Sequence, residues 1–240
     1  MAQFLLGILA SIIAAAVIAV LVQLTGFGRS RLKRLWQQRG LLRRMAAAGV
    51  SNFYASRAEY QSHRGAPGLT DYLATAHTSI KAATYWMAHG NEAEGAARVI
   101  ADLVQQKNLE VDIAVIDPQS PHIAQLSEYL DIELEELRLR IRSSIARLLE
   151  ARERLSPEAK TRLRIRSYQN LPIASVIMLD TDTDEGRVQL DIKPYRTPRD
   201  RSFGIELTGP DGPLYQTVRD AWTQLVESAP EVDPATYLYD

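Results

Sequence analysis

The sequence predicts an α/β protein in which one mixed sheet, flanked by helices, follows an N-terminal transmembrane helix. Three observations lead to this prediction. The chain opens with a long uncharged apolar segment at residues 4–24. Helix and strand patterns then alternate through the first half of the remaining chain, and strand patterns dominate between residues 162 and 208. This order of elements is typical of a single α/β domain with a mixed sheet.

A membrane anchor is predicted for residues 1–28. Residues 4–24 are 21 consecutive uncharged positions rich in Leu, Ile, Val and Ala. At about 1.5 Å per residue, a helix of this length spans roughly 31 Å, close to the hydrocarbon thickness of a bilayer. Seven cations follow between residues 29 and 44, and no acidic residue precedes Glu59. The positive-inside rule therefore predicts a single-pass protein of the inner membrane with a cytoplasmic C-terminal domain.

A cleaved secretory signal is the alternative interpretation of the same segment. Such a signal carries positive charge before an apolar core of about 7–15 residues and ends at a small-residue cleavage site. In this chain the positive charge follows the apolar run, and the run is longer than such a core. The order of charged and apolar residues therefore favours an anchor.

Small side chains recur every four residues along the predicted transmembrane helix, and a glutamine continues their stripe. The stripe consists of Gly7, Ser11, Ala15, Ala19 and Gln23. Small residues let transmembrane helices approach closely, and an amide can form a hydrogen bond across a helix pair. We therefore expect a homo-oligomer that forms through this face. The alternative is that an Ala-rich span produces such a stripe by chance.

Residues 29–46 are predicted to form a basic amphipathic helix next to the membrane. Apolar residues such as Leu35 and Leu42 fall near one side of this helix, among the cations. We expect Trp36 to anchor the helix at the interface and the cations to lie near anionic lipid, so the lipid bilayer is a predicted partner. A simple stop-transfer collar is the alternative.

The charge balance of the remaining chain argues against generic nucleic-acid binding. The whole chain has 28 basic and 29 acidic residues, and removing the seven cations of residues 29–44 leaves 21 basic against 29 acidic ones, a net charge of −8. Generic nucleic-acid binding relies on neutralising phosphates with cations. The chain also has no cysteine, which excludes disulfides, thiol catalysis and thiolate metal sites.

The first half of the domain alternates helices and strands. A capping-box-like sequence begins at Asn91, alternating apolar and polar residues from Glu110 favour a strand, and Ser120 precedes a proline in the order that starts a helix. The expected elements are a helix at 69–79 capped by Thr70, a strand at 80–86, a helix at 91–106, a strand at 110–117 and a helix from residue 120.

The second half begins with a long helix at 132–155. Its apolar stripe is expected to pack on the domain's own core, because about three heptads are short for a coiled coil. The remaining expected elements are strands at 162–168, 172–180, 187–195 and 202–208 and a final helix at 213–228. The domain is predicted to cover residues 47–230, followed by a loosely ordered tail at 231–240.

Three stretches carry a resemblance to a known superfamily. They are DYLATAHTSIKAATYW at 71–86, VDIAVIDPQSP at 111–121, and RIRSYQNLPIASVIMLD at 164–180 followed by VQLDIKPY at 188–195. With the order of elements, they make residues 49–229 resemble the phospholipase D-like superfamily, and more closely an uncharacterised bacterial branch of it. The resemblance implies an α/β domain of that superfamily.

The superfamily's catalytic motif is degenerate in this chain. Its enzymes carry H-x-K-x-x-x-x-D, in which the histidine attacks phosphorus and the lysine holds phosphate oxygens. When the aspartate of the motif is aligned with Asp180, Ile173 takes the place of the histidine and Ser175 that of the lysine. Because isoleucine can be neither a nucleophile nor a general acid, the resemblance implies a catalytically inactive member.

Other catalytic and metal motifs are also missing, so no cofactor and no metal site are expected. The four histidines of the sequence are scattered along the chain. Asp180, Asp182 and Asp184 are spaced as in a calcium loop, with Asp191 eleven positions after the first, but Glu185 occupies the position that such a loop gives to glycine. A solvated acidic turn is therefore the preferred interpretation of this cluster.

The resemblance implies that cations near the ends of the last two strands face a phosphate-binding cleft. A degenerate site could keep affinity for phosphate through hydroxyl, ammonium and guanidinium donors. The candidate ligand-binding residues are Ser175, Asp180, Lys193, Arg196 and Arg201. The alternative is that these cations belong to a solvated surface turn.

The leading hypothesis is a membrane-anchored sensor or interaction module without catalysis, which binds a phosphorylated or nucleotide-type ligand or a partner protein. By analogy with small membrane-tethered modules of bacterial signalling and defence, it would signal through its oligomerising anchor. Two alternatives come from other classes. One is a phosphodiester hydrolase that uses Asp180, Lys193, Arg201 and His77, and the other is a membrane scaffold whose helix at 132–155 binds a partner.

Overall fold

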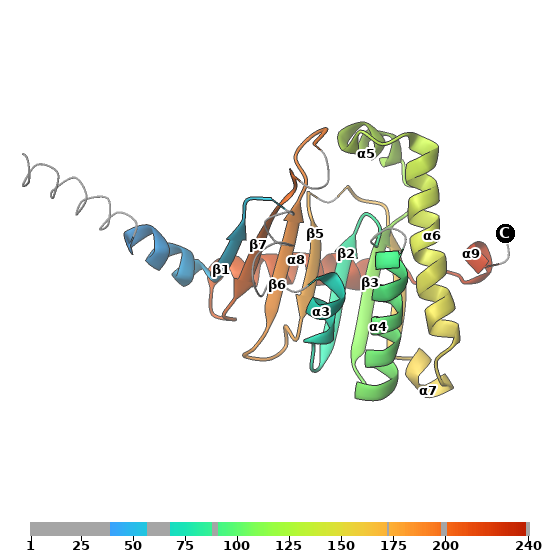
Figure 1. Cartoon of the computed structure of the whole chain (residues 1–240), viewed down its shortest axis with the longest axis horizontal. Helices are drawn as coiled ribbons and strands as arrows, with labels where there is room; N and C mark the ends of the chain where they lie inside the picture. Colours follow the sequence, from blue (N-terminus) through green and yellow to red (C-terminus); the bar gives the residue numbers. More distant parts are fainter. Residues whose placement is uncertain (1–38, 57–67, 88–90, 172, 198–200, 239–240) are drawn as a thin grey trace, which may run out of the picture. The chain divides into compact units, whose positions relative to one another are not determined.

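The computed structural model of the chain describes residues 39–56, 68–87, 91–171, 173–197 and 201–238 (Figure 1). The chain divides into two compact units, residues 1–46 and residues 47–240. The second unit contains every strand described below.

The predicted membrane anchor falls outside the described residues. The same holds for the predicted membrane and oligomer residues, which are Gly7, Ser11, Ala15, Ala19, Gln23 and Trp36. Of the predicted helix at 29–46, the described part begins at residue 39 and is helical, with Leu41 and Leu42 exposed. Within the part of the chain that the structure describes, no helix is both long and apolar enough to cross a bilayer.

The described strands form one seven-stranded mixed sheet in the order β1-β7-β6-β5-β2-β3-β4. Three neighbouring strands are parallel, and the others continue the sheet with antiparallel pairs. The parallel strands are β2 (Ser79–Thr84), β3 (Glu110–Ile116) and β4 (Leu163–Tyr168). The antiparallel part consists of β5 (Ser175–Leu179), β6 (Arg187–Ile192), β7 (Phe203–Thr208) and β1 (Val50–Tyr54). The predicted mixed sheet is therefore confirmed.

Helices cover both faces of this sheet (Figure 1). On one face lie α3 (Leu69–Ala74), α4 (Asn91–Lys107) and α6 (Leu134–Glu153), together with the shorter α5 (Ile123–Leu130). On the other face α8 (Pro213–Ser228) runs across the strands, behind the sheet in Figure 1. Two short helices, α7 (Pro157–Lys160) and α9 (Ala235–Leu238), complete the described elements.

The core lies against the parallel strands, which are covered on both faces. Residues 111–116 of β3 are all buried, as expected for a strand between two helical layers. On α6 the side chains of Leu137, Ile141, Ile145 and Leu148 are buried in this core. The expectation that the long helix packs on its own domain is therefore confirmed.

Some element boundaries differ from the sequence predictions. The helix expected at 69–79 ends at Ala74, because the strand that follows it already begins at Ser79. The strand expected at 187–195 ends at Ile192, shortly before Pro194, which has no N–H to donate to the sheet. The strand expected at 172–180 is the shorter β5.

Two parts of the sheet region were missed or misjudged from the sequence. Strand β1 was not predicted, because it is an edge strand whose middle residues are exposed and show no apolar alternation. The tail expected to be loosely ordered is attached to β4 instead. The N–H of Val232 donates to the carbonyl of Ile165 at 2.9 Å, and the α9 helix follows.

A close backbone approach joins the start of β1 to the start of α8. Gly49 has φ +93°, a left-handed value that favours glycine, and its carbonyl accepts a hydrogen bond from Thr208 N at 2.8 Å. A Cβ atom added to Gly212, the N-cap of α8, would lie 2.7 Å from Gly49 Cα. The two glycines therefore let β1 pair with β7 directly beside α8.

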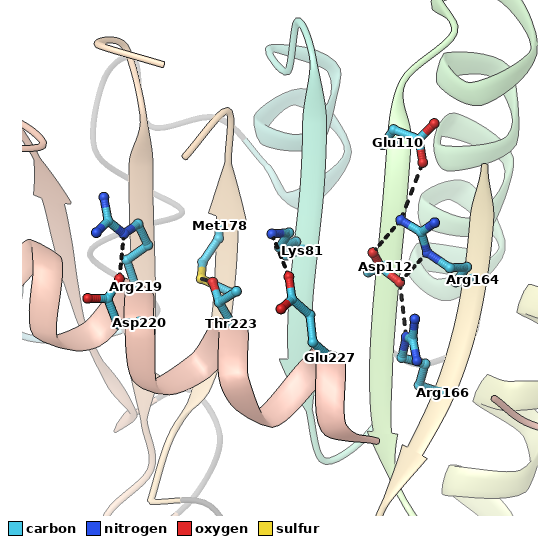
Figure 2. Close-up of polar contacts among 10 residues, drawn as sticks. All are labelled: Lys81, Glu110, Asp112, Arg164, Arg166, Met178, Arg219, Asp220, Thr223 and Glu227. Atoms are coloured by element: carbon cyan, nitrogen blue, oxygen red, sulfur yellow. Dashed lines mark hydrogen bonds and ion pairs between the residues drawn. The ribbon is translucent and has the colours of Figure 1, made fainter. Parts of the chain in front are cut away.

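On the face covered by α8, a buried carboxylate binds two arginines of the neighbouring strand (Figure 2). Asp112 on β3 accepts hydrogen bonds at 2.8 Å from Arg164 and at 3.0 Å from Arg166, both on β4. Arg166 also donates to the carbonyl of Ala229, directly after α8, at 2.9 Å. Burial would raise the pKa of the Asp112 carboxyl, but the hydrogen bonds and charges of the two arginines outweigh it and lower the pKa.

This cluster yields a stability prediction. Asp112→Ala removes the buried carboxylate that Arg164 and Arg166 share, so it should lower the free energy of unfolding by about 2–3 kcal/mol. Asp220→Ala removes an exposed pair with Arg219 on α8 and should cost less than about 0.5 kcal/mol. Urea unfolding of the full chain in detergent measures both. Equal losses in the two variants would contradict a structural role for the Asp112 cluster.

Candidate ligand-binding cavity

A cavity of about 490 Å³ lies at one end of β2, β5 and β6. Because β5 is antiparallel to both neighbours, its first residues meet the last residues of β2 and β6 there. The cavity is on the face of the sheet opposite to α8. Ala82 and Ile177 line it, whereas their sequence neighbours Lys81 and Met178 contact α8 (Figure 2). Its volume is in the range typical of small-molecule sites.

The strands supply a polar floor, which we define as Thr84, Ser175, Gln189, Asp191 and Gly204. Ser175 on β5 pairs directly with Asp191 on β6, and Asp191 pairs with Gly204 on β7. The hydroxyls of Ser175 and Thr84 lie 3.3 Å apart. Hydroxyl, amide and carboxylate groups are therefore next to one another on a rigid surface of backbone-paired strands.

Three cations stand at the cavity and form what we call the cationic rim: Arg140, Lys193 and Arg196. Arg140 of α6 forms an ion pair with Glu136, and its guanidinium lies over the ring of Trp86, 6.0 Å from the ring centroid. Its Nε atom is buried and has no hydrogen-bond partner among the described residues. The rim therefore brings positive charge from α6 and from the segment after β6 to the same cavity.

The rim is attached to the C-terminal end of α5. The Lys193 ammonium donates to the carbonyl of Leu130 at 2.9 Å, and the Tyr129 hydroxyl donates to the carbonyl of Lys193 at 2.7 Å. The N–H of Arg196 donates to the carbonyl of Tyr129 at 2.8 Å. These bonds hold the segment after β6 against a helix, so the two cations are positioned although they follow the end of their strand.

Tyr85 and Trp86 contribute aromatic surface to the cavity. Burial raises the pKa of the Tyr85 hydroxyl well above its ordinary value, and the nearby Tyr129 and Asp191 add to the rise. The Tyr85 side chain is therefore a neutral phenol across the physiological pH range.

The structure brings together three of the five predicted ligand-binding residues. Ser175, Lys193 and Arg196 line the cavity, whereas Asp180 and Arg201 do not. Arg201 is exposed and directly precedes Ser202, which does line the cavity. Asp180 follows the last residue of β5, at the opposite end of the strand from Ser175.

Asp180 binds the backbone at the start of β2. Its carboxylate accepts hydrogen bonds from the N–H groups of His77 at 3.0 Å, Thr78 at 2.7 Å and Ser79 at 3.0 Å, and from the Thr78 hydroxyl at 2.9 Å. Burial would raise the pKa of the Asp180 carboxyl, but these hydrogen bonds outweigh it and lower the pKa. We therefore assign Asp180 a structural role instead of the predicted ligand contact.

The four residues of the hydrolase hypothesis are not gathered in one place. Asp180 and His77 adjoin at the N-terminal end of β2, Lys193 lines the cavity near its C-terminal end, and Arg201 lies outside the cavity lining. Among the described residues, no group of three or more His, Cys, Asp or Glu side chains could hold a metal ion.

Among the cavity residues that the sequence analysis did not predict are Trp86, Arg140, Gln189 and Asp191. The period-two pattern of β6 carried a signal for two of them, because Gln189 and Asp191 alternate with buried Val188 and Leu190. No sequence signal indicated Arg140, which resembles the other exposed cations of a long helix.

Comparisons with known proteins give structural similarity without a match in sequence. No family model matches the chain, and no curated protein matches it. The phospholipase D family member Nuc from Salmonella typhimurium has a TM-score of 0.42 and 12% identity, over 68% of this chain and 88% of Nuc. Phosphatidylserine synthase from Haemophilus influenzae Rd KW20 has a TM-score of 0.48 and 17% identity, over 72% of this chain and 37% of that chain.

A third similar structure is the archaeal chromatin protein TrmBL2, described as showing a novel mode of DNA binding. Its TM-score is 0.43 with 11% identity, over 85% of this chain and 66% of TrmBL2. The TM-scores of these three similar structures all lie below 0.5.

Asp180 yields a second stability prediction. Asp180→Ala removes the acceptor of three backbone N–H groups and should lower the free energy of unfolding by about 2–4 kcal/mol. Asp180→Asn should cost less, because Oδ1 accepts most of these bonds and asparagine tolerates the left-handed φ of +54° at this position. Thermal and urea unfolding in detergent measure both variants.

The pH dependence checks the same role. Because the folded pKa of Asp180 is lowered, its stabilising contribution is complete above the ordinary carboxyl pKa of about 4 and is lost as the pH falls below it. The Asp180→Asn variant should therefore lose less stability than the wild type between pH 6 and pH 3. An unchanged pH profile in this variant would contradict the assignment.

Proposed function

We propose that the chain is a membrane-anchored, catalytically inactive phospholipase D-like module that binds a phosphorylated or nucleotide-type ligand in the cavity. In this proposal the binding event is passed to an oligomerising membrane helix, as in bacterial signalling or defence effectors. The observation that carries the proposal is the cavity, where the cationic rim stands beside Ser175, the residue at the lysine position of the degenerate motif.

The absence of catalysis is supported by what stands at the other motif position. Ile173 occupies the place of the attacking histidine and is 76% exposed, and its hydrocarbon side chain has no lone pair to form a bond with phosphorus. The histidines in the described part of the chain, His77 and His122, do not line the cavity. The lysine of the motif is replaced by Ser175, whose hydroxyl can bind a phosphate oxygen but carries no charge.

The chemistry of the cavity supports an anionic ligand with a less polar part. Guanidinium groups form paired hydrogen bonds with phosphate oxygens, and an ammonium group adds positive charge. The rim has two guanidinium groups and one ammonium group. Trp86 and Ile177 offer apolar surface within the same cavity. A nucleotide or another phosphorylated small molecule combines both properties.

Binding can be measured by calorimetry on the full chain in detergent, with ATP and inorganic pyrophosphate as probes. Arg140→Gln and Arg196→Gln should each weaken binding by about tenfold, because each removes a charge-assisted hydrogen bond. Arg219→Gln on α8, on the opposite face of the sheet, is the matched control and should leave affinity unchanged. If neither ATP nor inorganic pyrophosphate gives heat, a scaffold that binds only proteins would be favoured.

The same preparation tests the proposed lack of catalysis. We expect no turnover of a generic phosphodiester above the protein-free background. Turnover that is retained through purification and lost in Lys193→Ala would instead establish a hydrolase.

The proposed anchor is tested separately. After a carbonate wash of membranes, the full chain should stay in the membrane fraction, because 21 uncharged residues are long enough to span the bilayer. The double variant Gly7→Leu with Ala15→Leu should reduce the size of the detergent-solubilised particle if the small-residue stripe packs helices together. Release by carbonate would refute the anchor, and an unchanged size would refute assembly through this stripe.

A further inference from the structure

The polar floor has a chemistry that the proposed binding of phosphate does not explain. Asp191 pairs directly opposite Ser175, so a carboxylate lies beside the hydroxyl at the motif's lysine position. A phosphate placed on this floor would meet a like charge, whereas at the cationic rim it would meet three positive charges. The floor must therefore face a different part of the ligand from its phosphate.

The groups of the floor fit a ligand rich in hydroxyls. The carboxylate of Asp191 accepts hydrogen bonds, while the amide of Gln189 and the hydroxyls of Ser175 and Thr84 can both donate and accept. Adjacent ring hydroxyls need this combination, since each of them donates once and accepts as well. The neutral Tyr85 phenol and the ring of Trp86 line the same cavity and add amphipathic surface of the kind that a sugar ring presents.

Space for such a ring lies beside Asp191, where β7 contributes a residue without a side chain. Gly204 pairs with Asp191 and lines the cavity. A Cβ atom at Gly204 would have its nearest neighbour at 3.5 Å, an ordinary van der Waals distance. A Cβ atom therefore fits here in contact with Tyr54, and the glycine itself adds no side chain to the cavity.

We propose that the polar floor recognises the hydroxyl groups of a sugar ring, so that the ligand is a phosphorylated sugar, free or as the ribose of a nucleotide. Asp191 is the residue that determines this specificity, and the phosphate binds at the cationic rim. This inference rests on the proposed function and adds the class of compound that the cavity selects.

Calorimetry on the full chain in detergent tests the inference with ribose 5-phosphate, butyl phosphate and ribose. The first two carry the same phosphomonoester charge, but only ribose 5-phosphate has ring hydroxyls. We expect ribose 5-phosphate to bind at least about tenfold more tightly than butyl phosphate, since hydrogen bonds to a charged acceptor are lost with the hydroxyls. Ribose alone should bind more weakly than its phosphate.

Two variants separate recognition from a general loss of structure. Asp191→Asn should weaken ribose 5-phosphate by about tenfold and strengthen butyl phosphate, because it removes a strong acceptor and a like charge at once. Gly204→Val should fill the space beside Asp191 and weaken ribose 5-phosphate while leaving inorganic pyrophosphate bound. Opposite effects on two ligands cannot come from unfolding, and the melting temperature of each variant checks the fold.

The outcomes distinguish this inference from the function on which it rests. Equal affinities for ribose 5-phosphate and butyl phosphate would overturn the sugar inference and leave phosphate binding intact. Equal affinities for ribose and ribose 5-phosphate would overturn the phosphate site and leave sugar recognition by the polar floor intact. Binding of none of the three would overturn both. Comparison of AMP with ribose 5-phosphate identifies the source of the sugar phosphate. Tighter binding of AMP indicates a nucleotide, and equal or weaker binding of AMP indicates a free sugar phosphate.

Discussion

Asp180 directly follows β5, and its carboxylate accepts hydrogen bonds from three consecutive backbone N–H groups at the start of β2. This contact sets the register between a strand of the parallel half of the sheet and the first strand of the antiparallel half. With that register, Ser175 at the start of β5 lies beside Thr84 at the end of β2. The cavity is at this end of the two strands, opposite to Asp180. These contacts with the backbone give Asp180 a structural role in the sheet.

The change from parallel to antiparallel pairing at β2 also explains why one side of the cavity is apolar and the other is polar. In the parallel half, helices cover both faces of the sheet, and in β3 every side chain from residue 111 to 116 is buried. In the antiparallel half, α8 covers one face, and on the other face β6 presents Gln189 and Asp191 to the cavity. A rigid polar surface therefore adjoins the apolar core, and the cations of α6 and of the segment after β6 stand beside it.

Much of this architecture could be predicted from the sequence, because periodicity and capping signals are local. The helix at 134–153 and the strand at 110–116 were located nearly at their observed bounds. The cavity was harder to predict, because its residues come from segments far apart in the chain. Ser175 and Lys193 were identified through the resemblance, whereas Arg140 reaches the cavity only because α6 packs beside Trp86. Asp180 was misjudged since its partners lie about a hundred residues earlier in the chain.

The bond between the Lys193 ammonium and the carbonyl of Leu130 has a mechanical consequence. That carbonyl belongs to the last turn of α5, whose orphan acceptors need a donor from outside the helix. An anion bound in the cavity would compete with this carbonyl for the Lys193 ammonium and would weaken the bond to the end of α5. Occupancy of the cavity and the order of the C-terminal turn of α5 would then be thermodynamically linked, so that a change at either one would alter the other.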